Sequence, residues 1–127
     1  MPKYWYDHVH LMSPDPVKTS QFYEEMIGAE KINQRELPGG GLSIELHING
    51  SRILIMQTKS PTATPPDQID AGLEHFGLFT DDVVAAVADL KAKGVKIRDE
   101  VREIRPGVKI AFIWAPENVL IELVEIQ

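Results

Sequence analysis

Apolar and polar residues alternate most clearly between Leu42 and Asn49, where aliphatic side chains occupy every second position. This period of two predicts a strand with one buried face. The dipeptide Asn49-Gly50 that follows is typical of a tight β-hairpin, and residues 52–57 form the expected returning strand. A shorter strand is expected at residues 30–36, which gives three strands in succession.

The segment before these strands predicts one further strand and one helix. Residues from Tyr6 to Met12 alternate weakly, which indicates a strand. Asp15 suits the N-cap of a helix and Pro16 suits its first position. Gly28 is a suitable helix end. The first part of the chain therefore has the order β-α-β-β-β.

The second part repeats this order. Residues 73–80 predict a strand, Asp81 or Asp82 caps a helix, and Gly94 ends that helix. The chain closes with three further predicted strands, at residues 95–97, 108–114 and 119–126.

A proline-containing connector at residues 59–71 separates the two parts, which are residues 4–58 and 72–127. An internal repeat of this size governs the choice of fold. We expect an α+β fold in which two tandem βαβββ modules form a single domain over residues 1–127.

Composition narrows the class of protein. With 43% hydrophobic and 25% charged residues, the 127-residue chain matches an ordinary globular domain. A net charge of −6, with basic residues scattered among carboxylates, argues against a nucleic-acid partner. No apolar run approaches the roughly 20 residues of a membrane span, so we expect no membrane partner. The amino terminus lacks the features of a signal peptide and there is no cysteine, so we expect a cytoplasmic protein.

The candidate chemistry lies in two histidines that recur with the modules. His8 and His75 are 67 residues apart, and each is followed seven residues later by an aspartate. Glu122 lies 47 residues after His75 inside an apolar predicted strand, where a charge is costly unless it is paired or metal-bound. The same spacing from His8 leads to Ile55. The pattern predicts a divalent metal bound by His8, His75 and Glu122, with an apolar residue in the fourth place.

Several other polar residues are candidates for lesser roles. His10 shares the predicted face of His8, so it is either a substrate-contacting residue or a packed histidine. Gln57 is an alternative fourth ligand, and Glu36, before a glycine-rich loop, is a carboxylate that could reach a pocket. We expect solvent exposure for His47, and solvated or capping roles for a further group of carboxylates: Glu24, Glu25, Glu74 and Glu125.

At these residues the chain resembles the vicinal oxygen chelate superfamily, which contains glyoxalase I, methylmalonyl-CoA epimerase, extradiol dioxygenases and bleomycin or fosfomycin resistance proteins. The similarity covers essentially the whole chain. It rests on Asp7-His8-Val9-His10-Leu11 with Phe22-Tyr23, on Leu73-Glu74-His75, and on residues 116–125. The resemblance implies that His8, His75 and Glu122 bind the metal, that the modules form an open barrel-like cleft, and that the protein is a homodimer.

The resemblance leaves several functions open. One is a lyase or isomerase of glyoxalase I or epimerase type, in which a metal chelates a small-molecule substrate and Glu122 or Glu36 moves a proton next to its carbonyl group. Glyoxalase I and the epimerase usually carry a fourth ligand, which Ile55 does not supply. A three-ligand enzyme, either an extradiol-type dioxygenase or a resistance thiol transferase, is therefore an alternative. Another is a non-catalytic protein that binds a drug or other small molecule. The metal itself is open among Ni, Co, Mn, Zn and Fe.

Overall fold

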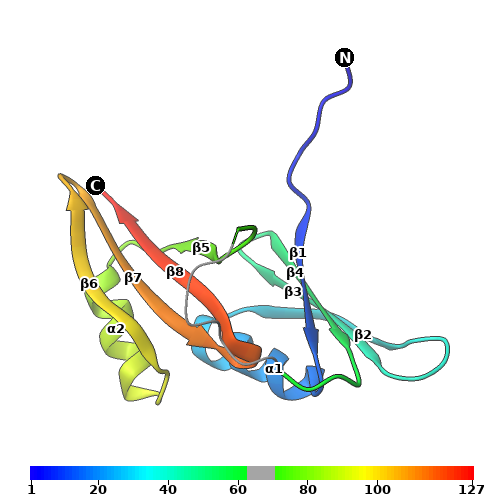
Figure 1. Cartoon of the computed structure of the whole chain (residues 1–127). Coiled ribbons are helices and arrows are strands. Elements are labelled where there is room, and N and C mark those ends of the chain that lie inside the picture. The colour runs from blue at the N-terminus through cyan, green and yellow to red at the C-terminus, as the bar shows by residue number, and fades with distance from the viewer. Residues whose placement is uncertain (63–70) are drawn as a thin grey trace. The chain divides into compact units, whose positions relative to one another are not determined.

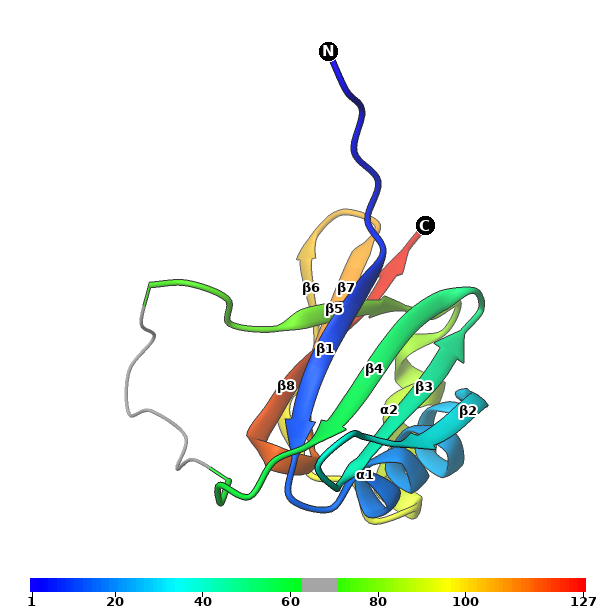
Figure 2. The same ribbon diagram turned by 90° about the vertical axis from the view of Figure 1, so that its right-hand side faces the viewer.

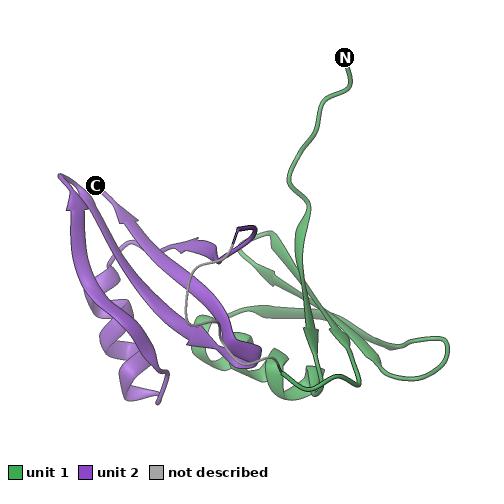
Figure 3. Cartoon of the chain, in the orientation of Figure 1, with its two compact units in different colours: residues 1–62 green, residues 63–127 purple. Residues whose placement is uncertain are grey.

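The computed structural model describes residues 1–62 and 71–127 and divides into two compact units, Met1–Thr62 and Ala63–Gln127 (Figure 3). Each unit contains one β-α-β-β-β series, so the prediction of two such modules is confirmed. Residues 63–70 of the expected connector 59–71 lie outside the described residues. No helix in the described ranges is long and apolar enough to cross a membrane.

Unit 1 is a four-stranded sheet with one helical segment (Figures 1 and 2). Its strands have the spatial order β1-β4-β3-β2, with β1 parallel to β4 and the other pairs antiparallel. The elements are β1 (His8–Ser13), α1 (Pro16–Phe22), the π-helical turn η1 (Tyr23–Ile27), β2 (Glu30–Glu36), β3 (Leu42–Ile48) and β4 (Ser51–Gln57).

The helix and hairpin signals of unit 1 act as the sequence predicts. The side chain of Asp15 accepts a hydrogen bond from the Lys18 backbone N–H at 3.2 Å, and Pro16 begins α1. Gly28 ends η1 with a φ of +81°, which a residue without Cβ adopts at little cost. Asn49 and Gly50 both have positive φ, as a type I′ hairpin turn requires. The π-helical geometry of η1 has no counterpart in the prediction.

Unit 2 repeats the plan, with the strand order β5-β8-β7-β6 and β5 parallel to β8. Its elements are β5 (Phe76–Phe79), α2 (Val83–Ala92), β6 (Ile97–Arg105), β7 (Val108–Ala115), the 3₁₀ turn η2 (Pro116–Asn118) and β8 (Val119–Ile126). Both sheets are open, and neither closes into a barrel. Two predicted strands change in length: β5 starts at Phe76, so His75 precedes it, and β6 is much longer than residues 95–97.

The amino terminus of α2 has two caps. Asp82, not Asp81, is the N-cap, because its side chain accepts from the Ala85 N–H at 3.0 Å. Glu125 on β8 is 5% exposed and accepts from the Val83 N–H at 2.9 Å. The expectation of a capping or solvated role for Glu125 resolves to capping, and the bond ties the helix to the sheet.

Each sheet buries one face under its own helix. In unit 1, alternate residues of the two central strands are buried and pair across them, as Ile44 with Ile55 and Leu46 with Ile53. In unit 2, Glu125 contacts the start of α2, so Leu123 and Ile121, which share its face, lie on the helix side. Burial of these aliphatic side chains against the helices is the main stabilising contribution within each unit.

The opposite side of each sheet, here called the helix-free face, differs between the units. In unit 1 it carries mainly polar side chains: His8 and His10 of β1, Asn33 and Arg35 of β2, Ser43, Glu45 and His47 of β3, and Arg52 of β4. In unit 2 it carries an apolar cluster of Val108, Ile110, Phe112 and Leu120, with Trp114 and Val124 packed against it. The candidate site residues of the two units thus lie in different surroundings.

Candidate functional site

Both candidate histidines are held by the acidic residue that precedes them. Nδ1 of His8 lies 2.6 Å from Oδ2 of Asp7, and Nδ1 of His75 lies 2.9 Å from Oε1 of Glu74. A carboxylate on Nδ1 fixes the orientation of an imidazole and leaves Nε2 as the ligand atom. The repeated acid-His dipeptide was therefore a usable signal, although Glu74 was expected to be merely solvated or capping.

In unit 2 the second nitrogen of His75 meets Glu122. Nε2 lies 2.7 Å from Oε2 of the glutamate, and the two side chains are 29% and 20% exposed. The parallel pairing of β5 with β8 produces this approach, because Gly77 pairs with Glu122 and His75 lies two residues earlier in the chain. The 47-residue spacing therefore corresponds to a direct contact between two of the predicted ligands.

One aromatic ring lies against this pair. The ring of Phe112, which pairs with Glu122 across β7 and β8, meets the His75 ring edge-on with centroids 5.1 Å apart. The guanidinium carbon of Arg98 lies 4.8 Å from the centroid of the same Phe112 ring. The Phe112 ring thus covers one side of His75, while the side chains of the pair remain 29% and 20% exposed.

The residue types of the pair suit a cation. A neutral imidazole has a single N–H, so His75 can donate to both carboxylates only when its ring is protonated. His75 and Glu122 would together hold a divalent metal in place of the hydrogen bond that now joins them. Glu74 would then remain on Nδ1 as the orienting carboxylate.

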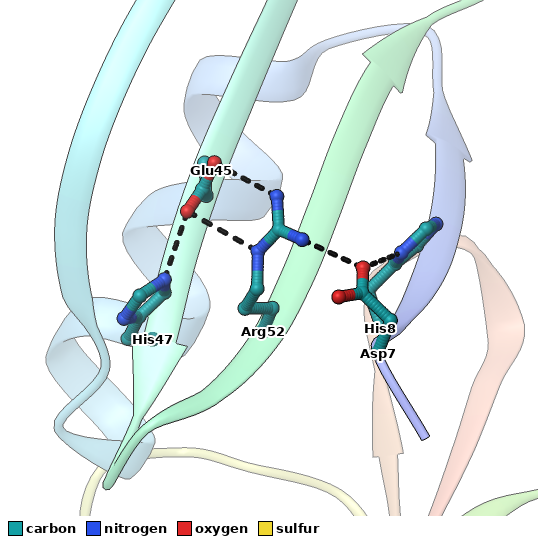
Figure 4. A network of polar contacts seen from close by, with 5 residues as sticks. All are labelled: Asp7, His8, Glu45, His47 and Arg52. Atoms are coloured by element: carbon teal, nitrogen blue, oxygen red, sulfur yellow. Dashed lines mark hydrogen bonds and ion pairs between the residues drawn. The ribbon is translucent and has the colours of Figure 1, made fainter. Parts of the chain in front are cut away.

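In unit 1 the Asp7-His8 pair belongs to a larger network (Figure 4). Arg52 donates to Asp7 at 2.6 Å through one terminal nitrogen, and to Glu45 at 3.2 Å and 3.4 Å through the other terminal nitrogen and Nε. Nε2 of His47 lies 2.8 Å from Glu45. Arg52 thereby links the carboxylate that orients His8 to a second carboxylate on β3.

This network shifts three titrating groups. The hydrogen bond from His8, with the charge of Arg52, holds the pKa of Asp7 below its ordinary value of 3.8. Hydrogen bonds from Arg52 and then from His47 hold the pKa of Glu45 below 4.5. The pKa of Arg52 is raised, chiefly by its bond to Glu45. Both carboxylates are therefore ionised and Arg52 is charged at neutral pH.

The remaining histidines lie close to the predicted ones in unit 1. The rings of His8 and His10 meet edge-on with centroids 6.3 Å apart, which confirms that they share a face. His47 is not fully exposed as expected, since its side chain is 30% exposed and contacts Glu45. Arg52 had no distinguishing signal in the sequence, because only the strand register places it beside His8.

The expectation that Ile55 occupies the fourth ligand place is wrong. Ile55 is fully buried and pairs with Leu11 on the helix side of the sheet. Glu122 pairs with the residue two after His75, and the matching residue in unit 1 is Leu54, which pairs with His10. The first unit has one residue fewer over this interval, and one residue reverses the side to which a strand side chain points.

Two other candidates lie elsewhere in unit 1. Gln57 uses its side-chain oxygen to accept from the Leu42 N–H at 3.0 Å, so this atom stabilises the β3–β4 end of the sheet. Glu36 is the exposed last residue of β2, and its side chain has no hydrogen bond or ion pair within residues 1–62 and 71–127. Within either unit, the described residues contain no group of three or more acidic or histidine side chains that could alone hold a metal ion.

Comparison with known proteins agrees with this architecture. The model of the glyoxalase/bleomycin resistance protein/dioxygenase superfamily matches residues 7–112. A probable chloroplastic lactoylglutathione lyase of Arabidopsis thaliana is 33% identical over 122 residues, which are 93% of this chain and 35% of that protein. Mouse mitochondrial methylmalonyl-CoA epimerase is 28% identical over 92% of this chain and 70% of its own length. The chain thus spans about a third of the first relative.

Solved structures share the fold. A glyoxalase family protein from Enterococcus faecalis superposes with a TM-score of 0.82 at 22% identity, covering 95% of this chain and 97% of its own. A mutant of the fosfomycin resistance protein FosX from Listeria monocytogenes, complexed with Mn(II) and a dihydroxypropylphosphonic acid, gives 0.73 at 22% identity. That comparison covers 94% of this chain and 90% of FosX. At these identities the likeness establishes the fold.

Proposed function

The chain belongs to the glyoxalase/bleomycin resistance protein/dioxygenase superfamily, and on that premise we propose that it is a metal-dependent lyase or isomerase acting on a small molecule. The reaction is proton transfer next to a metal-chelated carbonyl group, as in glyoxalase I or an epimerase. The contact between His75 and Glu122 carries the proposal, because it joins two groups of metal-ligand type in apolar surroundings. The relatives named as lyase and epimerase support the reaction class.

The proposed ligands are His8, His75 and Glu122, each from a residue type that Ni, Co, Mn, Zn and Fe accept. Asp7 and Glu74 hold the two imidazoles by Nδ1, which leaves Nε2 as the ligand atom of each ring. When bound, the metal would act as a Lewis acid that polarises a carbonyl oxygen of the substrate. A site of three protein ligands leaves further positions for substrate oxygens.

The chain supplies two candidate bases for the proton transfer. Glu122 is half-buried beside His75, so its carboxylate is partly shielded from water. Glu36 is exposed at the end of β2 and is open to a substrate from solvent. Either carboxylate would hold the proton taken from the carbon next to the carbonyl group and return it to the product.

Hydrogen exchange with deuterated water tests this function. Candidate α-hydroxy ketones, thiohemiacetals and acyl thioesters would be incubated with protein loaded with each of the five metals and followed by NMR. We expect exchange of the hydrogen next to the carbonyl in at least one case, and its loss in Glu122→Gln or after chelation. His47→Ala is the matched control and should keep the activity. Metal binding without exchange of any substrate would contradict the proton-transfer assignment.

One observation favours a second function. The residue that matches Glu122 in unit 1 is Leu54, which cannot ligate a metal. Three-ligand centres suit an extradiol-type dioxygenase or a resistance thiol transferase. Oxygen consumption with catechols under Fe(II), or thiol addition to an epoxide under Mn(II), would distinguish these activities from isomerisation.

A further inference from the structure

The helix-free face of unit 1 contains a pocket that the proposed metal ligands do not account for. Its volume is about 480 Å³, within the range of small-molecule sites. It is lined by residues of the three strands β2, β3 and β4: Asn33, Arg35, Ser43, Glu45, Arg52 and Leu54.

The strand register explains why these side chains gather. Asn33 pairs with Glu45, which pairs with Leu54, and Leu54 pairs with His10 of β1. Arg35 pairs with Ser43 in a neighbouring row. Side chains of paired residues point to the same side of a sheet, so the pocket and the two histidines of β1 share one face.

Two of the charged residues in the pocket already satisfy each other. All three groups of the Arg52 guanidinium donate, one to Asp7 and two to Glu45. Glu45 also contacts the ring of His47. Arg52 and Glu45 therefore hold each other in place, and both already have hydrogen-bond partners without a ligand (Figure 4).

Arg35 is different. Its guanidinium has no hydrogen bond or ion pair with any residue in the part of the chain that the structure describes, and the same holds for the side chains of Asn33 and Ser43. The ionisable lining comprises Arg35, Arg52 and Glu45, two positive charges and one negative, so the pocket has a net charge of +1 in a chain whose net charge is −6. The Arg35 guanidinium can only donate, and Asn33 and Ser43 can each donate as well, so all three can serve one acceptor.

We propose that this pocket binds an oxyanion, carried by a small molecule as a carboxylate or a phosphate. Arg35 forms a two-pronged contact with it, and Asn33 and Ser43 add neutral hydrogen bonds. A lysine in place of Arg35 would supply the positive charge but not the planar guanidinium that makes two parallel hydrogen bonds.

For the metal-dependent reaction, the inference rests on the proposed function and narrows its substrate. β1 and β2 are three strand spacings apart, or about 14 Å at roughly 4.8 Å each. A substrate that meets both His8 and Arg35 is therefore extended, with its reacting oxygens at one end and an anionic group at the other.

The test is anion binding by metal-free, full-length protein. The Nε–H signal of Arg35 would be followed by NMR during titration with sodium phosphate and, separately, sodium succinate, at constant ionic strength in the presence of EDTA. We expect a saturable shift with at least one probe. The probe that binds more tightly indicates whether the pocket prefers a phosphate or a carboxylate. In the variants, which lack this signal, binding would be followed through the backbone amide signals of Asn33 and Ser43. Arg35→Gln should weaken binding about tenfold or more, and Arg35→Lys by less.

Arg102→Gln is the matched control, because Arg102 lies exposed on β6, the edge strand of the other unit as β2 is of this one. It removes the same charge and should leave binding within about twofold. No saturable shift at Arg35 with either probe, or equal weakening by Arg102→Gln, would overturn the proposal. Since no metal is present, failure of the metal site leaves this result intact.

Discussion

Units 1 and 2 share a βαβββ plan but differ on their helix-free faces. In unit 1, His8 sits in a network of charges in which Arg52 joins Asp7 to Glu45. In unit 2, His75 lies between two carboxylates beside an apolar cluster that includes Phe112. The charged network depends on several partners and includes Asp7, whose side chain is 64% exposed, whereas the unit 2 pair is 29% and 20% exposed.

The difference shows that two copies of one repeat carry different sets of candidate side chains. Both units contain the acid-His dipeptide, and in each the acidic side chain forms a hydrogen bond with Nδ1 of the histidine. The residue two positions after each histidine differs in its partner. In unit 2 it is Gly77, which pairs with Glu122, and in unit 1 it is His10, which pairs with Leu54. Two of the proposed metal ligands therefore belong to unit 2 and one belongs to unit 1, which also contains a polar pocket.

The largest effect should come from placing a carboxylate on the wrong side of the unit 1 sheet. Ile55→Glu buries a charge under α1, so we expect a loss of about 3–5 kcal/mol in the free energy of unfolding. Leu54→Glu, one residue away on the half-exposed side, should cost less than about 1.5 kcal/mol and tighten metal binding. Denaturant unfolding and metal titration measure both. Equal destabilisation by the two variants would contradict the assigned register.

A smaller effect should follow loss of the charge link in unit 1. Arg52→Gln removes the group that anchors Asp7, so His8 loses a fixed orientation and metal affinity should fall about tenfold. The ¹⁵N shifts of the metal-free His8 ring should show a less fixed tautomer. Arg102→Gln is the control. If the His8 tautomer and the metal affinity are unchanged in Arg52→Gln, then Asp7 orients His8 without the hydrogen bond from Arg52.

The smallest effect concerns pH. Asp7 and Glu45 have lowered pKa values in the folded chain, so their contacts are fully present above the ordinary values of 3.8 and 4.5. The contacts are lost as the pH falls through the lower, folded values. Carboxyl ¹³C titration should show both shifts in the wild type and values closer to ordinary in Arg52→Gln. Identical titration curves in the two proteins would exclude the network in solution.

The sequence predicted the modules because their signals are local. Asp15 with Pro16, Gly28 and Asn49-Gly50 each act within a few residues of their own backbone, and the structure uses them as expected. The approach of His75 to Glu122 was also within reach, since an isolated carboxylate in an apolar strand requires a partner.

Features that depend on strand register were beyond sequence reasoning. Ile55 was misassigned because the spacing from His75 to Glu122 was applied to unit 1, where the corresponding interval, from His8 to Leu54, is one residue shorter. The role of Arg52 depends on its pairing with His8 of β1 and with His47 of β3. Pairing of that kind depends on the lengths of loops and on side-chain packing across the sheet, and no local motif specifies it.

The most direct test of the central claim is metal titration of the full-length protein after chelator treatment. The wild type should bind one divalent ion per chain, and His8→Ala, His75→Ala and Glu122→Ala should each weaken binding about 100-fold or more. His47→Ala and His10→Ala, which alter histidines of the same helix-free face, should change it less than about threefold. Absence of stoichiometric binding by the wild type, or equal weakening by His47→Ala, would contradict a metal centre built from His8, His75 and Glu122.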